Sequence, residues 1–463
     1  MFSEDRDGGS VAQQGSRLPR WVGALAAVAV AVFGVSACGG DDNSGGGSGG
    51  AGAGNVSKAS GAELAKMLGY SSDDLNALKG KTIKMGAILA LSGPESAHGT
   101  SMRRGLELAK KDIAAAGGPN LDIQYEDQKS GDPQAAVTAA RNIAEAGNGV
   151  TLTSYEFNFG AQLPVFKRYK MLAIDPGGGT GGLFNGNDYA WGFRGIEPDD
   201  ALKGGWQYIH ENYPQVKRVG NVIWDLGDEF VNALTGHTKD AVEASDMQLA
   251  GTVRSKIGTT DYSDAISKLR GMNVDAVHLN MAGLDLAYFT KQWKAAGLGD
   301  KPLLGNEYLP EMSPIAGKSF ENWLFAVDYW QPQDAPNPLS KLFQKHFQES
   351  YKKAPSSFYE ANFYEAGLAM WELALRMQKN GGDLSSGADW QKALVQNPEF
   401  KSVYGSDPNT VGTIKLDTKT HSPSVRPDGV WQIQNGKPVQ VASFNVGGGD
   451  YKQLKKAAGA AGS

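Results

Sequence analysis

The alternation of apolar and polar positions predicts successive β-strands and α-helices from about residue 80 onward. The first is a buried strand, Ile83–Leu91, which is apolar apart from Lys84 and ends at Ser92-Gly93-Pro94. A helix over 101–116 and an alternating strand over 121–127 follow, and Asp132 then precedes a helix with Pro133 at its first position. Further short strands are expected over 150–154 and 171–175. This order predicts a parallel α/β sheet with helices on both faces.

The same alternation starts again after residue 200, which predicts a second α/β unit. The expected helices and strands alternate over 201–213, 219–225, 228–245, 249–253, 264–271, 274–280, 285–297 and 302–305, and a further strand is expected over 323–330. Three helices are expected next, over 339–353, 360–379 and 388–396, and then a strand over 412–417. A hairpin over 430–441 should turn at Asn435-Gly436, a dipeptide typical of two-residue hairpin loops.

The N-terminal residues have the pattern of an export signal. Arg6, Arg17 and Arg20 precede an uncharged run over 21–34, which is shorter than the roughly 20 apolar residues of a membrane span. Small residues then lead to Cys38, the only cysteine of the chain. We expect a signal peptide over 1–37 and a bacterial lipobox, with lipid on Cys38 anchoring the protein to the outer face of the cell membrane. A buried structural cysteine, or cleavage by an ordinary signal peptidase, is the alternative.

Residues 38–56 are rich in Gly, Ser, Ala, Asn and Asp and predict a flexible tether. The apolar residues within 57–80 have helical spacing and predict a short helical lead-in. The formal net charge is -5, with 41% hydrophobic residues, which is ordinary for a globular protein. This balance provides no basic surface for nucleic acid, so no nucleic-acid partner is expected.

The chain has few patterns that would support catalysis. Residues 177–182 match G-x-G-x-x-G after a strand, but turn-like residues follow where a dinucleotide site needs a helix. The loop is better explained by a close approach of backbone to a ligand. The six histidines lack metal-ligand spacing, and no Ser/His/Asp or Cys/His arrangement is suggested. We expect no catalytic residues, no metal and no cofactor. The aromatic-rich helix over 358–377 is interpreted as core.

Five stretches occur in a suggestive order: Leu91-Ser92-Gly93-Pro94, Asp132–Val137, Ala173–Gly177, Asp261–Ile266 and Leu304–Glu307. Together they resemble the branched-chain amino-acid-binding (Leu/Ile/Val-type) family of type I periplasmic binding proteins, which serve ABC transporters, over residues 80–445. The resemblance implies two doubly wound parallel-sheet lobes joined by three crossover strands, near 194–197, 326–330 and 417–430. Lobe 1 would comprise 80–195 and 330–415, lobe 2 would comprise 197–326 and 416–445, and 446–463 would form a tail.

The resemblance also implies where a ligand is held. His98 corresponds to a large side chain of the first loop. The loop Tyr155-Glu156-Phe157 corresponds to a hydroxyl side chain that holds the ligand's α-carboxylate. Gly177, Gly178, Gly179 and Thr180 correspond to a backbone amide and a threonine that contact the same carboxylate. Phe230, or Glu229 one residue earlier, aligns near the position of one tyrosine of the family. Ala282 aligns near the position of another. Glu307 matches the acid that pairs with the ligand's ammonium group.

Two of these positions depart from the family. Glu156 would place an anion where a carboxylate should dock, and Gly179 lacks the threonine hydroxyl, although Thr180 is adjacent. A hydroxyl-rich, amide-like or cationic solute fits Glu156 and Glu307 better than a leucine-like one. Alternatively, Glu156 faces solvent in a loop aligned one position wrong. Tight binding of leucine, weakened by Glu156→Ala, would contradict the hypothesis.

The prediction is a monomeric, extracytoplasmic substrate-binding lipoprotein that captures a small polar solute (an amino acid, amide, amine or polyol) by hinge closure and delivers it to ABC permease subunits. A ligand-sensing receptor that acts through a separate membrane partner is a second possibility. An exported α/β hydrolase is disfavoured because no nucleophile or base is placed.

Overall fold

The computed structural model describes residues 58–459, apart from 94–95, 130–131, 155, 179–183, 185, 195–197, 226, 257, 328–336, 356, 406 and 446–448. Cys38, the predicted signal peptide and the predicted tether lie outside the described residues. Most residues of the first and second predicted crossovers also lie outside the described residues. Within the described residues, no helix combines the length and apolar character that a membrane span requires.

The first sheet has five parallel strands in the order β2-β1-β3-β4-β5. Its strands are β1 (Thr82–Leu89), β2 (Asn120–Asp127), β3 (Val150–Leu152), β4 (Leu172–Asp175) and β5 (Ala190–Gly192). The helices between them are α3 (Ser96–Ala115), α4 (Pro133–Glu145) and α5 (Glu156–Tyr169). Asp132 caps α4 as expected, since its side chain accepts from the N–H groups of Gln134 and Ala135.

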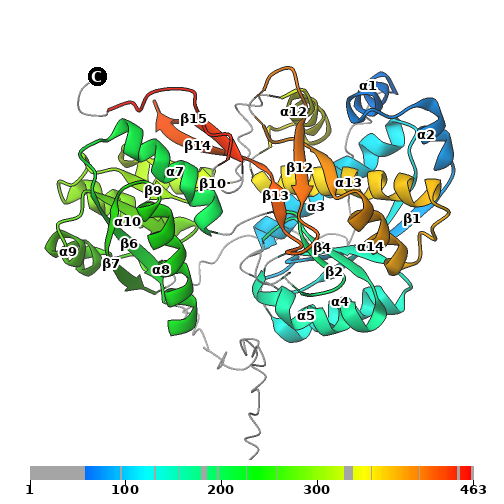
Figure 1. Ribbon diagram of the computed structural model, residues 1–463, viewed down its shortest axis with the longest axis horizontal. Helices are drawn as coiled ribbons and strands as arrows, with labels where there is room; N and C mark the ends of the chain where they lie inside the picture. The colour runs from blue at the N-terminus through cyan, green and yellow to red at the C-terminus, as the bar shows by residue number, and fades with distance from the viewer. Residues whose placement is uncertain are drawn as a thin grey trace, which may run out of the picture. The chain divides into compact units, whose positions relative to one another are not determined.

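The second sheet has eight strands in the order β16-β15-β14-β10-β9-β8-β6-β7, of which β6 to β10 are parallel (Figure 1). Its strands are β6 (Arg218–Trp224), β7 (Gln248–Ser255), β8 (Ala276–Asn280), β9 (Leu303–Gly305), β10 (Leu324–Val327), β14 (Pro427–Gln434), β15 (Lys437–Asn445) and β16 (Lys452–Gln453). The accompanying helices are α7 (Pro198–Asn212), α8 (Asp228–Glu243), α9 (Ser263–Gly271), α10 (Leu284–Ala295), η1 (Pro310–Met312), α11 (Ser313–Ala316) and η2 (Gly317–Phe320).

The parallel strands of the two sheets follow the same order. If the strands of each unit are numbered along the chain, both sheets have the order 2-1-3-4-5, which is a doubly wound topology. The predicted fold class is therefore confirmed. The hairpin of the second sheet turns at Asn435 and Gly436, whose φ angles of 52° and 71° are those that a tight hairpin turn requires.

Three long helices and a small sheet complete the first unit. The helices are α12 (Pro338–Tyr351), α13 (Phe358–Lys379) and α14 (Gly387–Gln396), and the antiparallel strands are β11 (Glu399–Ser402), β12 (Gly412–Leu416) and β13 (Pro423–Val425). Most side chains of α13 are buried, including Trp371, so its interpretation as core is confirmed. Because β13 pairs with β12 and β14 pairs with β10, the chain changes sheets at Arg426.

The lead-in consists of two helices, α1 (Lys58–Leu68) and α2 (Ser72–Ala77). Leu64 and Leu78 are fully buried in the main core, so the lead-in packs against the first unit. The contact is close at Gly61, where a Cβ atom would lie 2.3 Å from the carbonyl carbon of Ala115 at the end of α3. A larger residue at this position would push α1 away from α3.

Three local expectations were wrong. Helix α3 begins at Ser96 and not at 101, and its first turn lies so close to β1 that a Cβ atom on Gly99 would be 1.9 Å from the carbonyl oxygen of Ala90. Glu156 and Phe157 begin helix α5 and are not in a loop; Pro164 inside this helix weakened its sequence pattern. Within the expected tail, β16 pairs with β15.

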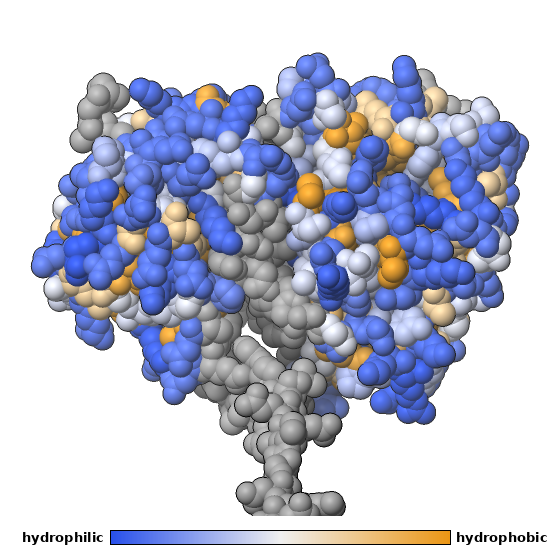
Figure 2. Space-filling model, viewed as in Figure 1, coloured by the Kyte–Doolittle hydropathy of each residue, from blue (hydrophilic) through white to orange (hydrophobic). Residues whose placement is uncertain are grey.

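Hydrophilic residues predominate on the face that Figure 2 shows. Among the described residues, the large apolar side chains that are exposed are Tyr169, Leu284, Val395 and Leu454, which belong to four different segments. Isolated apolar residues of this kind are normal on a solvated surface.

Candidate functional site

The topology indicates where each sheet can hold a ligand. In a doubly wound sheet, the helices that follow the first and third strands lie on opposite faces, which opens a crevice at the carboxyl ends of these strands. The relevant pairs are β1 with β3 and β6 with β8. His98 follows β1 and Glu156 follows β3, whereas Glu229 and Ala282 follow β6 and β8. Four of the predicted ligand positions therefore follow strands at these switch points.

Glu307 follows β9 and is half-buried. One of its carboxylate oxygens accepts the backbone N–H of Gly283, at 2.5 Å, which fixes the side chain beside Ala282. Burial raises the pKa of Glu307, while the Gly283 N–H and the charges of His98 and Arg194 lower it. The charges that act on Glu307, which follows a strand of the second sheet, thus include two basic residues that follow strands of the first sheet.

His98 lies in the first turn of α3 and is half-buried, with its ring centroid 5.1 Å from that of Tyr359. It lines a pocket of about 260 Å³ together with residues of both units: Thr100, Ser101, Arg104, Leu309, Glu311 and Ser357. Arg104 is 32% exposed, and its guanidinium lies 3.5 Å from the carboxylate of the buried Glu360. All of these lining residues except Leu309 have a polar or charged side chain, so a solute held here can form hydrogen bonds as well as apolar contacts.

The loop after β4 is held by its own hydrogen bonds. Asp175 accepts the backbone N–H groups of Gly177 and Gly178, at 2.8 and 3.0 Å. The carbonyl oxygen of Gly177 accepts from Arg194, at 3.0 Å. A Cβ atom at Gly177 would lie 3.0 Å from Cβ of Ser154, so the loop packs tightly against the end of β3. The family resemblance assigns the backbone N–H groups of this loop to a ligand carboxylate. In this structure, the N–H groups of Gly177 and Gly178 donate to the carboxylate of Asp175.

The remaining predicted positions are only partly described. Ala282 is half-buried between β8 and α10. The backbones of Glu156 and Phe157 start α5, and those of Glu229 and Phe230 lie in the first turn of α8, but their side chains are outside the described part of the structure. Tyr155, Gly179 and Thr180 also lie outside the described residues. The assignment of these residues to the ligand stays a prediction.

Sequence reasoning missed two basic residues of this region. Arg194 is buried, and its guanidinium lies over the ring of Phe358, 4.4 Å from the centroid. Arg104 was missed because it appears in the sequence as one of several charges on an amphipathic helix. An arginine two residues after a short buried strand, as at Arg194, is the one indication that the sequence offered. No group of three or more His, Cys, Asp or Glu suited to a metal ion occurs within the described ranges.

The fold and the composition of the site define a class of two-unit α/β proteins that hold a small ligand at the carboxyl ends of their strands. The sequence model of the periplasmic binding protein family matches residues 82–438, and the chain belongs to this family.

Among curated relatives, a Leu/Ile/Val-binding protein homologue of Brucella abortus is 24% identical over 367 residues, which cover 77% of this chain and 91% of the relative. Solved structures share the fold. A leucine-binding protein of Thermotoga maritima has a TM-score of 0.66 at 20% identity, covering 78% of this chain and 99% of its own. A solute-binding protein of R. palustris in complex with benzoate has a TM-score of 0.64 at 19% identity, covering 82% and 99%.

Proposed function

We propose that this chain is the extracytoplasmic solute-binding lipoprotein of an ABC importer, anchored by lipid on Cys38. It captures a small polar organic solute between its two α/β units by hinge closure and presents the solute to a permease. The observation that carries the proposal is that Glu307 of one unit and His98 and Arg194 of the other all follow strands at their carboxyl ends, and that the charges of His98 and Arg194 lower the pKa of Glu307. A solute held there touches both units, so binding stabilises the closed form.

The charges favour a solute with groups of opposite character. Relatives of this fold are named for leucine, or were solved with benzoate or isoleucine, and each of these compounds carries a carboxylate. Arg194 provides a cation for such a group, and His98 provides a ring N–H donor, whereas Glu307 provides an acceptor for an ammonium or hydroxyl group. Amino acids are therefore the first candidates. Amides, amines and polyols, which can still bind Glu307, come next, and aromatic carboxylates join them through the relatives.

A thermal-shift screen tests the proposal. Full-length protein with Cys38→Ser is heated with amino acids, amides, polyamines, sugars, polyols and aromatic carboxylates. A solute at 100 times its Kd should stabilise the protein by about 2.7 kcal/mol, which raises the Tm measurably. The solute should be recovered chemically unchanged. A panel that leaves the Tm unchanged, or a solute that is consumed, would contradict the proposal.

The anchor has a separate test. The native chain, expressed in a bacterium with radiolabelled palmitate, should carry the label and sediment with membranes. The Cys38→Ser chain should do neither. Equal membrane association of the two chains would refute lipid attachment at Cys38.

A further inference from the structure

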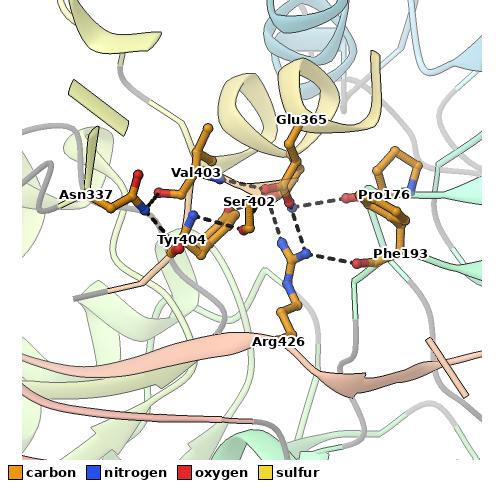
Figure 3. Close-up of polar contacts among 9 residues, drawn as sticks. Pro176, Phe193, Asn337, Glu365, Ser402, Val403, Tyr404 and Arg426 are labelled. Atoms are coloured by element: carbon orange, nitrogen blue, oxygen red, sulfur yellow. Dashed lines mark hydrogen bonds and ion pairs between the residues drawn. The ribbon is translucent and has the colours of Figure 1, made fainter. Parts of the chain in front are cut away.

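Arg426 occupies the point where the chain passes from β13 of the small sheet into β14 of the second sheet. Its side chain is fully buried and ion-paired with the equally buried Glu365 of α13, at 2.9 Å (Figure 3). The same guanidinium donates to the carbonyl oxygen of Phe193, at 2.9 Å, and lies 4.4 Å above the ring centroid of Tyr404. One side chain thus joins a crossover segment to a strand end and to a core helix.

The contact between Arg426 and Phe193 matters because of the position of Phe193 in the chain. Phe193 follows β5 directly and precedes the first predicted crossover, and its N–H group donates to the carbonyl oxygen of Asp175, at 2.8 Å. The guanidinium of Arg426 therefore holds the first and third crossover segments together at their ends in the first unit. In these two segments, we expect any bend that moves the second unit to occur beyond this point.

Asn362, one turn before Glu365 on α13, extends the network to the candidate site. Its side-chain oxygen accepts from Arg426, at 3.2 Å, and from the hydroxyl group of Tyr404. Its side-chain nitrogen donates to the carbonyl oxygen of Pro176, at 3.0 Å. Pro176 precedes Gly177 in the loop that the family resemblance assigns to the ligand, so two side chains connect that loop to the crossover.

Burial of the Arg426–Glu365 ion pair costs desolvation free energy, and what the pair provides in return is a fixed direction of the guanidinium group. A buried ion pair seldom stabilises a fold more than well-packed apolar residues of similar volume would. Here the second oxygen of Glu365 is also held, by the hydroxyl of Ser402 and the N–H of Val403, at 2.9 and 3.1 Å. The guanidinium fork is thereby fixed in direction, which an apolar side chain could not achieve.

We infer that Arg426 and Asn362 are positioning residues: Arg426 fixes the crossover segments to α13, and Asn362 couples them to the Pro176–Gly178 loop. The inference rests on the proposed hinge closure, but its test needs no ligand. A failed solute screen and a failed hinge measurement are therefore distinguishable.

The test compares Arg426→Lys with Arg376→Lys in full-length protein carrying Cys38→Ser. Lysine keeps the positive charge but cannot bond Glu365, Phe193 and Asn362 together. Arg376 is a matched control on the same helix, because it binds the carboxylate of Glu372, the carbonyl oxygens of Asn397 and Glu399, and the ring of Phe400, with no crossover segment involved.

Two measurements are made on each protein. Spin labels on the exposed positions Arg141 of α4 and Lys291 of α10, replaced by cysteine, report the distribution of distances between the units. Amide hydrogen exchange reports on the backbone N–H groups within residues 176–178, 190–194 and 423–427, where Pro176, Pro423 and Pro427 carry none. Arg426→Lys should give a distance distribution roughly twofold wider. It should also give exchange roughly tenfold faster in all three segments. Arg376→Lys should match the unsubstituted protein.

A second variant separates the two links. Asn362→Asp keeps an acceptor for Arg426 and Tyr404 but loses the donor to Pro176. It should speed exchange in 176–178 alone, and it remains informative if Arg426→Lys does not fold. Unchanged exchange in 176–178 for Asn362→Asp would overturn the coupling. A folded Arg426→Lys variant with an unchanged distance distribution, or with unchanged exchange in the loop, would also overturn it.

Discussion

Replacing Glu307 by glutamine separates the charge of this side chain from its hydrogen bond. The glutamine oxygen can still accept the Gly283 N–H, which the carboxylate accepts at 2.5 Å, so the geometry is kept while the charge is lost. At roughly 4 Å and an effective dielectric constant of about 20, a pair of opposite charges contributes about 4 kcal/mol. A solute whose ammonium group pairs with Glu307 should therefore bind about 10² to 10³ times more weakly to Glu307→Gln.

In the ligand-free protein, Glu307→Gln should increase the stability of the fold. Burial raises the pKa of Glu307 above its ordinary value of 4.5, which means that the fold disfavours the ionised form. A carboxyl with a raised pKa in the folded state makes stability fall as the pH rises through that pKa, because the unfolded chain has already lost the proton. Glutamine does not ionise, so the Glu307→Gln variant does not lose stability in this way as the pH rises. Its Tm should exceed that of the unsubstituted protein by a few degrees at about pH 7.5, and by less at about pH 4.5.

Calorimetry of ligand-free protein at both pH values measures the effect. Glu321→Gln is the control, since both oxygens of Glu321 accept backbone N–H groups, from Asn435 and Gly436, and glutamine can accept only one. Its Tm should fall slightly at both pH values. A Glu307→Gln variant that is less stable than the native protein at pH 7.5, or whose advantage does not grow with pH, would refute the argument from burial.

The remaining predictions concern the buried ion pair and two glycines. Arg426→Met should cost about 3–5 kcal/mol in unfolding free energy, because Glu365 is left buried without its cation, and Arg426→Met with Glu365→Gln should recover most of this in denaturant titrations. Burial already raises the pKa of Glu365 and Arg426 lowers it, so the single variant should lose stability as the pH rises above about 5, and a flat pH profile would contradict the assignment. Gly99→Ala should cost about 1–3 kcal/mol and weaken solute binding, since its Cβ would displace the turn that carries His98. Gly436→Ala, at a φ of 71°, should cost about 1 kcal/mol without changing solute affinity, and equal effects of the two glycine variants on affinity would contradict the placement of the site.

Local chemistry made much of the fold predictable. Asp132 before Pro133 predicted a helix start because the carboxylate accepts the free N–H groups there. Asn435-Gly436 predicted the hairpin because both residues tolerate a positive φ. Helix α5 was missed because Pro164 and Gly160 interrupt its pattern, although its buried Phe159 and Phe166 still form one apolar face.

Only the part of the site that lies at the ends of strands could be predicted from the sequence. Glu307 follows a recognisable strand, so its position at the carboxyl edge could be inferred. The Arg426–Glu365 pair could not, because its members are 61 residues apart and meet only through the tertiary fold. The one indication was Glu365 itself, a charged residue in a helix whose other residues are mostly apolar, because a buried charge requires a partner.

The central claim is that a solute binds between the two units and draws them together. It is tested most directly by the distance between spin labels at positions 141 and 291, measured without and with a saturating amount of the solute that raises the Tm most. We expect a shift of the distribution to shorter distances in the native protein, and a shift in Glu307→Gln only at much higher concentrations of an amine or amino acid. An unchanged distribution at saturation would contradict closure by hinge motion.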